Sequence, residues 1–192
     1  MIAIAENDTI ASAFARAAST YSALSLIAVP ANPDRDYDPD GLEISYGDMA
    51  ARVQVLANAY TAAGYGLGHR VGLFLDNRPE HFLHKLALNS IGACCVPINP
   101  DYRSGELAYV IDHAKLDLVV VLPSRQPALD QALALTEQQP VVAHAEQVSS
   151  ELVTAKRPVA NGSVTAATPS SILYTSGTTG RPKGCVLSHR YE

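Results

Sequence analysis

The sequence predicts an α/β fold in which a mainly parallel sheet is flanked by helices. Short apolar runs, typical of buried strands, alternate along the chain with amphipathic stretches of helical period. This alternation favours parallel strands with helices on both faces of the sheet. The run "LDLVVVL" is apolar on both faces, as expected for a central parallel strand. The composition agrees, since 47% of the 192 residues are hydrophobic and 17% are charged, which is typical of a globular domain.

Strands are assigned to apolar runs that are bounded by turn-forming residues. In chain order these runs are "ALSLIAV", "LEISY", "RVGLFL", "CCVPI", "LDLVVVL", "PVVAH", "ILY" and "CVL". Between the first two lies "PANPDRDYDPDG", whose proline, aspartate and glycine residues favour turns. Its alternating aspartates lack the glycine and distal glutamate of a calcium loop, so we expect a solvated turn there. These aspartates are Asp34, Asp36, Asp38 and Asp40.

Amphipathic stretches between these runs predict helices. Asp8 or Thr9 is expected to cap the first helix. The second helix ends at Gly64, and its apolar face consists of residues at helical spacing. That face is formed by Met49, Val53, Leu56 and Tyr60. Pro79 suits the first turn of a third helix, and Gly92 suits its exit.

The remaining segments predict shorter elements. Helices are expected around residues 106–113, around residues 128–136 and near Val148. The stretch "TAKRPVANGSVTAATPSS" is rich in small, polar and helix-breaking residues, which predicts a surface connector. Ser188 is expected to cap a helix after the last strand.

Charge and hydropathy exclude several classes of partner. The formal net charge of −5 gives the chain no overall attraction to nucleic acid or to anionic membranes. No apolar run approaches the roughly 20 residues that span a bilayer. The opening "MIAIAENDTI" lacks the basic region and long apolar stretch of a secretory signal. The sequence therefore predicts a cytoplasmic protein that binds neither nucleic acid nor a membrane interior.

Cysteine and histidine residues give no metal or disulfide pattern. Cys94, Cys95 and Cys185 form neither a disulfide framework nor a zinc site, and the first two are expected to be small hydrophobes in a buried strand. His81 and His84 lie three residues apart on a predicted helix, a spacing that suits two metal ligands, but the sequence offers no third ligand. We therefore expect a solvated helix face there, and no metal ligands in the chain.

The stretch "YTSGTTGRPKG", residues 174–184, combines glycines, hydroxyls and a lysine between two apolar runs. Its glycines allow a ligand to approach the main chain closely, and loop amides can form an anion-binding concavity. Lys183 supplies a point charge suited to phosphate. The hydroxyls belong to Thr175, Ser176, Thr178 and Thr179. These groups favour a polyphosphate ligand, and the alternative is a plain surface turn.

The stretch does not fit the P-loop of nucleoside triphosphatases. That motif requires G-x-x-x-x-G-K-[ST] followed by a helix, whereas Pro182 precedes Lys183 and the following "CVL" predicts a strand. The phosphates would therefore not lie at a helix N-terminus. We expect the stretch to bind them through its own amides, hydroxyls and lysine.

These eleven residues resemble the phosphate-binding signature of the adenylate-forming (AMP-binding) superfamily, which includes acyl-CoA synthetases, luciferases and peptide-synthetase adenylation domains. The segments "ISYGDMAARVQVLANAYTAAGYGLGHRVGLFLDNRPE" and "ALNSIGACCVPINPDYRSGELAYVIDHAKLDLVV" are similar to the opening of that family. The resemblance covers the chain from about Leu42 onward, and residues 1–41 match less distinctively. His189 resembles a histidine that the family often carries after the signature, so it lies either on the substrate side or on a surface helix turn.

The resemblance implies two half-reactions. A carboxylate attacks the α-phosphate of Mg-ATP, which gives an acyl-adenylate and pyrophosphate, and the thiol of coenzyme A then displaces AMP. The signature would stabilise the charge on the departing pyrophosphate, with Lys183 as the catalytic residue. The phosphate-binding set carried over from the family is Thr175, Ser176, Gly177, Thr178, Thr179, Gly180 and Lys183. Arg181 occupies a variable position and is expected to face solvent, while Pro182 stiffens the bend.

The resemblance also implies that residues 1–192 are a partial N-terminal domain, which ends just after the loop at 174–184 and lacks the C-terminal domain. We therefore expect the chain alone not to catalyse adenylation, and its open sheet edges favour self-association. The parent function is predicted to be that of an acyl-CoA synthetase that takes ATP, Mg²⁺, a carboxylic acid and coenzyme A. The alternatives are a luciferase-like enzyme, an amino-acid adenylation domain, or a truncated chain that only binds a nucleotide or a partner.

Overall fold

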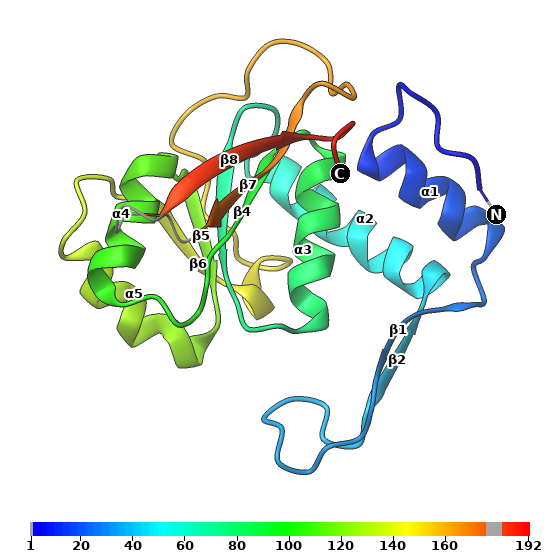
Figure 1. Ribbon diagram of the computed structural model, residues 1–192, viewed down its shortest axis with the longest axis horizontal. Helices are drawn as coiled ribbons and strands as arrows, with labels where there is room; N and C mark the ends of the chain where they lie inside the picture. The colour runs from blue at the N-terminus through cyan, green and yellow to red at the C-terminus, as the bar shows by residue number, and fades with distance from the viewer. Residues whose placement is uncertain (1, 176–181) are drawn as a thin grey trace.

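The computed structural model describes residues 2–175 and 182–192, and the main sheet has six strands in the order β6-β5-β3-β4-β7-β8 (Figure 1). The bounds are β3 Arg70–Phe74, β4 Cys94–Pro97, β5 Leu118–Val121, β6 Val141–His144, β7 Pro169–Thr175 and β8 Lys183–Ser188. Neighbouring strands from β6 to β7 are parallel, and β8 pairs antiparallel with β7. The predicted mainly parallel sheet is therefore confirmed.

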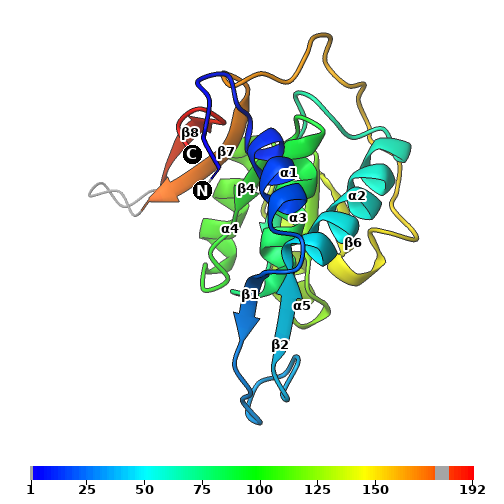
Figure 2. The same cartoon turned by 90° about the vertical axis from the view of Figure 1, so that its right-hand side faces the viewer.

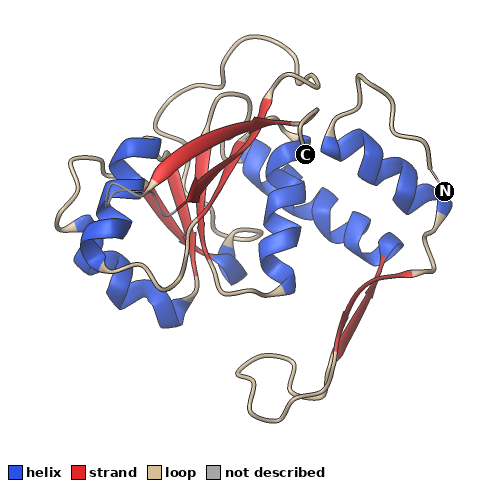
Figure 3. Cartoon of the chain, in the orientation of Figure 1, coloured by secondary structure: helices blue, strands red, loops and turns tan. Residues whose placement is uncertain are grey.

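Strands β1 (Ser25–Val29) and β2 (Leu42–Ser45) form a separate antiparallel pair. This pair and its connecting loop project away from the rest of the chain (Figure 3). Asp34, Asp36, Asp38 and Asp40 in that loop are all exposed. The expected solvated turn is confirmed.

Helices cover both faces of the main sheet (Figure 2). Helices α2 and α3 pack on one face with α1 against them, and α4 and α5 pack on the other face. The bounds are α1 Ile10–Thr20, α2 Tyr46–Ala62, α3 Pro79–Ser90, α4 Ser104–Ala114 and α5 Gln126–Leu133. Thr9 caps α1 as predicted, since its Oγ1 accepts a hydrogen bond from Ser12 N at 3.1 Å. Gly64 and Gly92 adopt positive φ angles of +84° and +76° at the ends of α2 and α3.

Strand β5 shows why a central parallel strand is apolar throughout. Side chains alternate between the two faces of a strand. Leu118 and Val120 point into the cluster beneath α2 and α3, whereas Val119 and Val121 point into the cluster beneath α4 and α5. Each of these four side chains is fully buried.

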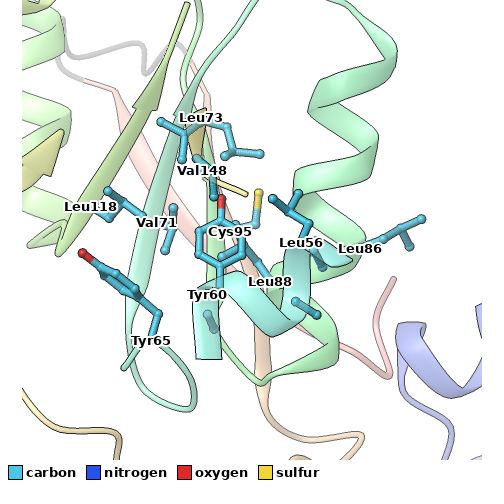
Figure 4. Packing of buried hydrophobic residues seen from close by; sticks show 14 of the residues in the cluster. Leu56, Tyr60, Tyr65, Val71, Leu73, Leu86, Leu88, Cys95, Leu118 and Val148 are labelled. Atoms are coloured by element: carbon cyan, nitrogen blue, oxygen red, sulfur yellow. The ribbon is translucent and has the colours of Figure 1, made fainter. Parts of the chain in front are cut away.

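The larger core cluster forms between the sheet, α2 and α3 (Figure 4). Tyr60 and Tyr65 are buried there, with their ring centroids 6.2 Å apart in an edge-to-face arrangement. Cys95 belongs to this cluster and Cys94 to the opposite one. Burial raises the pKa of the Cys94 thiol to about 12 and raises that of Cys95 as well, so both thiols are the small hydrophobes that the sequence predicts.

His84 corrects one expectation. It does not lie on a solvated helix face, because it is only 2% exposed and its Nδ1 lies 2.7 Å from the hydroxyl of Tyr60. Burial lowers the pKa of His84 to about 3. His81 is half-buried, and burial lowers its pKa too.

Three local expectations also change. The predicted helix at 128–136 runs from Gln126 to Leu133, because Pro127 suits the first turn of a helix. A short 3₁₀ helix, Ala145–Gln147, replaces the helix expected near Val148. Ser188 ends β8 and is followed by a turn at residues 189–191, so it caps no helix within the described residues.

The connector that precedes β7 is fastened to the main body by its backbone. Ala155 N donates to Ala63 O at 2.8 Å, and Ala160 N donates to Leu67 O at 2.9 Å. Arg157 forms an ion pair with Asp117, Nε to Oδ1, at 2.5 Å. These contacts place the start of β7 beside β4.

Candidate functional site: the β7–β8 hairpin

Strands β7 and β8 carry the two ends of the predicted phosphate-binding stretch. They pair antiparallel. Thr175 lies directly opposite Lys183 in the last pair before residues 176–182. Both residues are exposed. The strands that the sequence predicts on either side of residues 176–181 are therefore confirmed.

The other predicted phosphate-binding residues lie outside the described part of the chain. They are Ser176, Gly177, Thr178, Thr179 and Gly180, together with the neighbouring Arg181. The described geometry therefore concerns Tyr174, Thr175 and the residues from Pro182 onward.

Tyr174 is the residue just before Thr175, and its ring crosses to the opposite strand. A Cβ placed on Gly184 would lie 3.1 Å from Cζ of Tyr174, so the glycine leaves room for the ring. The Tyr174 hydroxyl lies 2.7 Å from Nδ1 of His113 on α4. Burial raises the pKa of Tyr174 to about 12, so the hydroxyl keeps its proton at neutral pH.

His113 is itself held on α4. Its ring stacks on that of Tyr109, one helical turn earlier, with the centroids 5.2 Å apart. Residues four apart on a helix lie on the same face. The contact between Tyr109 and His113 could therefore be predicted from their spacing in the sequence. Nothing in the local sequence indicates Tyr174, which is 61 residues further along the chain.

Pro182, at the other end of the stretch, lies beside a groove along the same helix. It is buried, and the groove along α4 has a volume of about 400 Å³. The groove is lined by Gly105, Glu106, Ala108, Tyr109, Asp112, Leu135 and Pro182. Helix α4 therefore contacts the hairpin at Tyr174 and shares a groove with Pro182.

The carboxylates in this groove already have hydrogen-bond donors. Glu106 accepts from Arg103 N at 2.9 Å. Asp112 accepts from Gln138 N at 2.9 Å and from Glu137 N at 3.2 Å. Within residues 2–175 and 182–192, no group of three or more His, Cys, Asp or Glu side chains is placed to hold a metal ion.

His189 does not lie on a surface helix turn, one of the two positions expected for it. It is 4% exposed, and its Nδ1 accepts a hydrogen bond from Ile10 N at 3.3 Å. The histidine therefore joins the end of β8 to the start of α1. Asn99 acts as a turn residue, since its Oδ1 accepts a hydrogen bond from Asp101 N at 3.0 Å.

A cavity of about 480 Å³ lies on the α2–α3 side of the molecule. Its walls include Leu56, Leu83 and His84. Neither β7 nor β8 contributes to it, and the His84 ring is already hydrogen-bonded to Tyr60. The cavity and the hairpin are therefore separate features. Among the described helices, none is both long and apolar enough to cross a membrane.

Comparison with known proteins identifies relatives of this chain. The crotonobetaine/carnitine–CoA ligase of Proteus mirabilis is 34% identical over 163 residues, which cover 77% of this chain and 31% of the ligase. A polyketide synthase–nonribosomal peptide synthetase of Aspergillus flavipes is 32% identical over 148 residues, 77% of this chain and 3% of that protein. The chain thus spans about a third of the ligase's length.

A solved structure agrees. The crystal structure of ATP-bound MatB from Rhodopseudomonas palustris superposes with a TM-score of 0.62 at 31% identity, over 78% of this chain and 30% of MatB. The AMP-binding enzyme family matches residues 20–191, which include both strands of the hairpin. The chain therefore belongs to the AMP-binding enzyme family, the adenylate-forming superfamily.

Proposed function

We propose that the β7–β8 hairpin binds the β- and γ-phosphates of Mg-ATP in an acyl-CoA synthetase, an enzyme that adenylates a carboxylic acid and transfers the acyl group to coenzyme A. The observation that carries the proposal is the pairing of Thr175 with Lys183 at the exposed end of two antiparallel strands. The pairing brings a hydroxyl and an ammonium group to the same end of the hairpin. Such a pair suits a polyphosphate.

Lys183 would stabilise charge as pyrophosphate leaves. A cation fixed near the β- and γ-phosphates offsets the negative charge that develops on the leaving group. The hydroxyl of Thr175 adds a donor from the opposite strand. Ser176, Gly177, Thr178, Thr179 and Gly180 complete the proposed phosphate-binding set, and Mg²⁺ bound with the nucleotide would add charge neutralisation.

The acid–thiol ligase assignment is supported by the CoA ligase from Proteus. A second candidate, an amino-acid adenylation domain, is supported by the similar peptide synthetase from Aspergillus. Both share the ATP-dependent first step and differ in the acid and in the acceptor thiol. Residues 1–192 alone are expected to bind the nucleotide without completing adenylation, since they span about a third of the ligase.

Calorimetric titration of the chain with Mg-ATP tests the proposal. Lys183→Ala should weaken binding by roughly 10- to 100-fold, because a hydrogen bond to a charged group contributes roughly 1.5–3 kcal/mol. The matched control is Lys156→Ala, which removes an exposed lysine from the connector and should leave the affinity unchanged. Equal affinities of Lys183→Ala and the unsubstituted chain would count against the phosphate-binding role.

An assay of pyrophosphate release tests the expectation that residues 1–192 alone do not complete adenylation. The chain, Mg-ATP and a panel of fatty, aromatic and amino acids should give no pyrophosphate above the background without protein. Turnover with any of these acids would refute the expectation that residues 1–192 are inactive alone.

The edge strand β8 supports an expectation of self-association. It forms one edge of the main sheet, and Val186 on it is 57% exposed. An unpaired edge with apolar side chains favours pairing with another chain. Sedimentation should show concentration-dependent dimers that Val186→Lys reduces, and a strictly monomeric chain would contradict this expectation.

A further inference from the structure

We propose that His113 is a positioning residue for the phosphate-binding hairpin, acting through Tyr174. This inference rests on the function proposed above and adds a residue from α4 to it. His113 would not touch the nucleotide. It would fix the strand end that carries Thr175 and, through the pairing of β7 with β8, the start of the strand that carries Lys183.

The hydrogen bond between His113 and Tyr174 is the first observation. Nδ1 of His113 lies 2.7 Å from the Tyr174 hydroxyl, and the two rings meet edge to face with centroids 5.8 Å apart. Tyr174 immediately precedes Thr175 in β7. A side chain fixed at this point restricts the direction in which the backbone leaves the strand.

The opposite strand is shaped to receive the same ring. Gly184 pairs with Tyr174 across the two strands. A side chain at this position would come within 3.1 Å of Cζ of Tyr174 and 3.2 Å of Cγ2 of Ile172. The glycine therefore leaves room for the Tyr174 ring to lie over β8.

His113 is supported by a second ring on its own helix. Its ring stacks on Tyr109 at 5.2 Å, and both residues lie in the last two turns of α4. Pro182 is buried beside the same helix and borders the groove that Ala108 and Tyr109 line. Helix α4 thus contacts the hairpin at Tyr174 and shares this groove with Pro182.

This arrangement has a functional consequence. A phosphate-binding group contributes most when its position is fixed before the ligand arrives, because the cost of ordering it is then already met. Without the hydrogen bond, Thr175 and Lys183 would have to be ordered on binding. The loss should appear in nucleotide affinity even when the fold is intact.

Four variants test the inference by titration with Mg-ATP. Tyr174→Phe removes the hydroxyl and keeps the ring over Gly184, and His113→Phe removes Nδ1 and keeps a ring against Tyr109. Each should weaken binding by roughly two- to tenfold, the range of one neutral hydrogen bond. The double variant should bind about as weakly as either single variant, because both remove the same interaction. His113→Asn, which places a polar atom where Nδ1 lies, should restore the affinity to within about twofold.

Two controls separate positioning from general stability. His144→Phe alters a half-buried histidine on β6, whose Nε2 lies 3.1 Å from Oε1 of Gln126, away from the hairpin. Gly41→Ala, at a φ of +91° just before β2, should destabilise the fold in the separate β1–β2 pair, away from β8. Neither should change the affinity of the folded chain for Mg-ATP.

A measurement without nucleotide checks the contact itself. The side-chain nitrogen resonances of His113 should shift in Tyr174→Phe, because Nδ1 loses its partner. Unmoved resonances would overturn the inference, as would unchanged Mg-ATP affinity in Tyr174→Phe and His113→Phe while Lys183→Ala still weakens binding. Absence of Mg-ATP binding by the unsubstituted chain would overturn both the proposed function and the inference. This outcome differs from failure of the inference alone, because Lys183→Ala would then have no effect on binding.

Discussion

The hydroxyl of Tyr60 lies 2.7 Å from Nδ1 of His84, and both side chains are buried in the core between α2 and α3. The two rings also meet edge to face, with centroids 6.1 Å apart. A buried imidazole is tolerated when its nitrogen atoms have hydrogen-bond partners. This pair therefore joins two helices through a polar contact inside an otherwise apolar cluster.

Acid should destabilise the chain through His84. Burial lowers its pKa to about 3, whereas an unfolded histidine titrates near about 6.5. Between these values the unfolded chain binds a proton that the folded chain excludes, so stability is lost as the pH falls from about 6.5 towards 3. The urea midpoint should drop between about pH 7 and about pH 5, and His84→Asn should flatten that dependence. The lowered pKa of His81 acts in the same direction, so a residual slope is expected. Identical slopes for His84→Asn and the unsubstituted chain would contradict this account.

Tyr60→Phe should destabilise the fold by roughly 1–3 kcal/mol, because it leaves Nδ1 of His84 buried without a partner. Replacing both residues by apolar ones removes the unmet hydrogen bond. The double variant Tyr60→Phe, His84→Leu should therefore lose less stability than the sum of the single variants. Chemical unfolding of the unsubstituted chain, the two single variants and the double variant measures this coupling. Strictly additive changes in the free energy of unfolding would show that the contact contributes nothing.

Gly92→Ala and Gly105→Ala should have opposite effects. Gly92 has a φ of +76°, and a Cβ there would lie 2.6 Å from Cγ2 of Val164. An L-residue in that conformation loses about 1–2 kcal/mol before the clash is counted. Gly105 lies in α4 with nothing within 4 Å of its Cβ position, so alanine should stabilise the helix by roughly 0.5–1 kcal/mol. Thermal midpoints that move in the same direction would refute the comparison.

Gly184→Ala should disturb the contact between Tyr174 and His113. The new methyl group would lie 3.1 Å from Cζ of Tyr174, the atom that bears the hydroxyl. Displacing the ring should cost roughly 1–3 kcal/mol of stability, as overpacking does, and should shift the His113 nitrogen resonances. Gly105→Ala, on the same helix as His113 but with free space around it, is the control. A Gly184→Ala chain with unchanged resonances would show that the ring adapts without loss of the contact.

The sequence predicts much of the architecture because the features that define it are local. Apolar runs such as "LDLVVVL" mark strands, and Pro79 and Gly92 mark the ends of α3. The order of the strands in the sheet is not local, since β3 lies between β4 and β5 only through pairings between distant segments.

Long-range contacts also explain what sequence reasoning misses at the core and the site. The sequence predicts a solvated face for His84 because the partner that buries it, Tyr60, is 24 residues away. Thr175 and Lys183 can be found from the spacing of their own stretch. His113 cannot, because its relevance comes from Tyr174, 61 residues further on.

The hydrogen bond from Ile10 N to Nδ1 of His189 spans 179 positions of the chain. Helix α1 is synthesised first, whereas His189, whose Nδ1 accepts this hydrogen bond, is synthesised only after β8. The hydrogen bond that joins the amino end of α1 to the turn after β8 can therefore form only later in synthesis than the packing of α1 on α2 and α3.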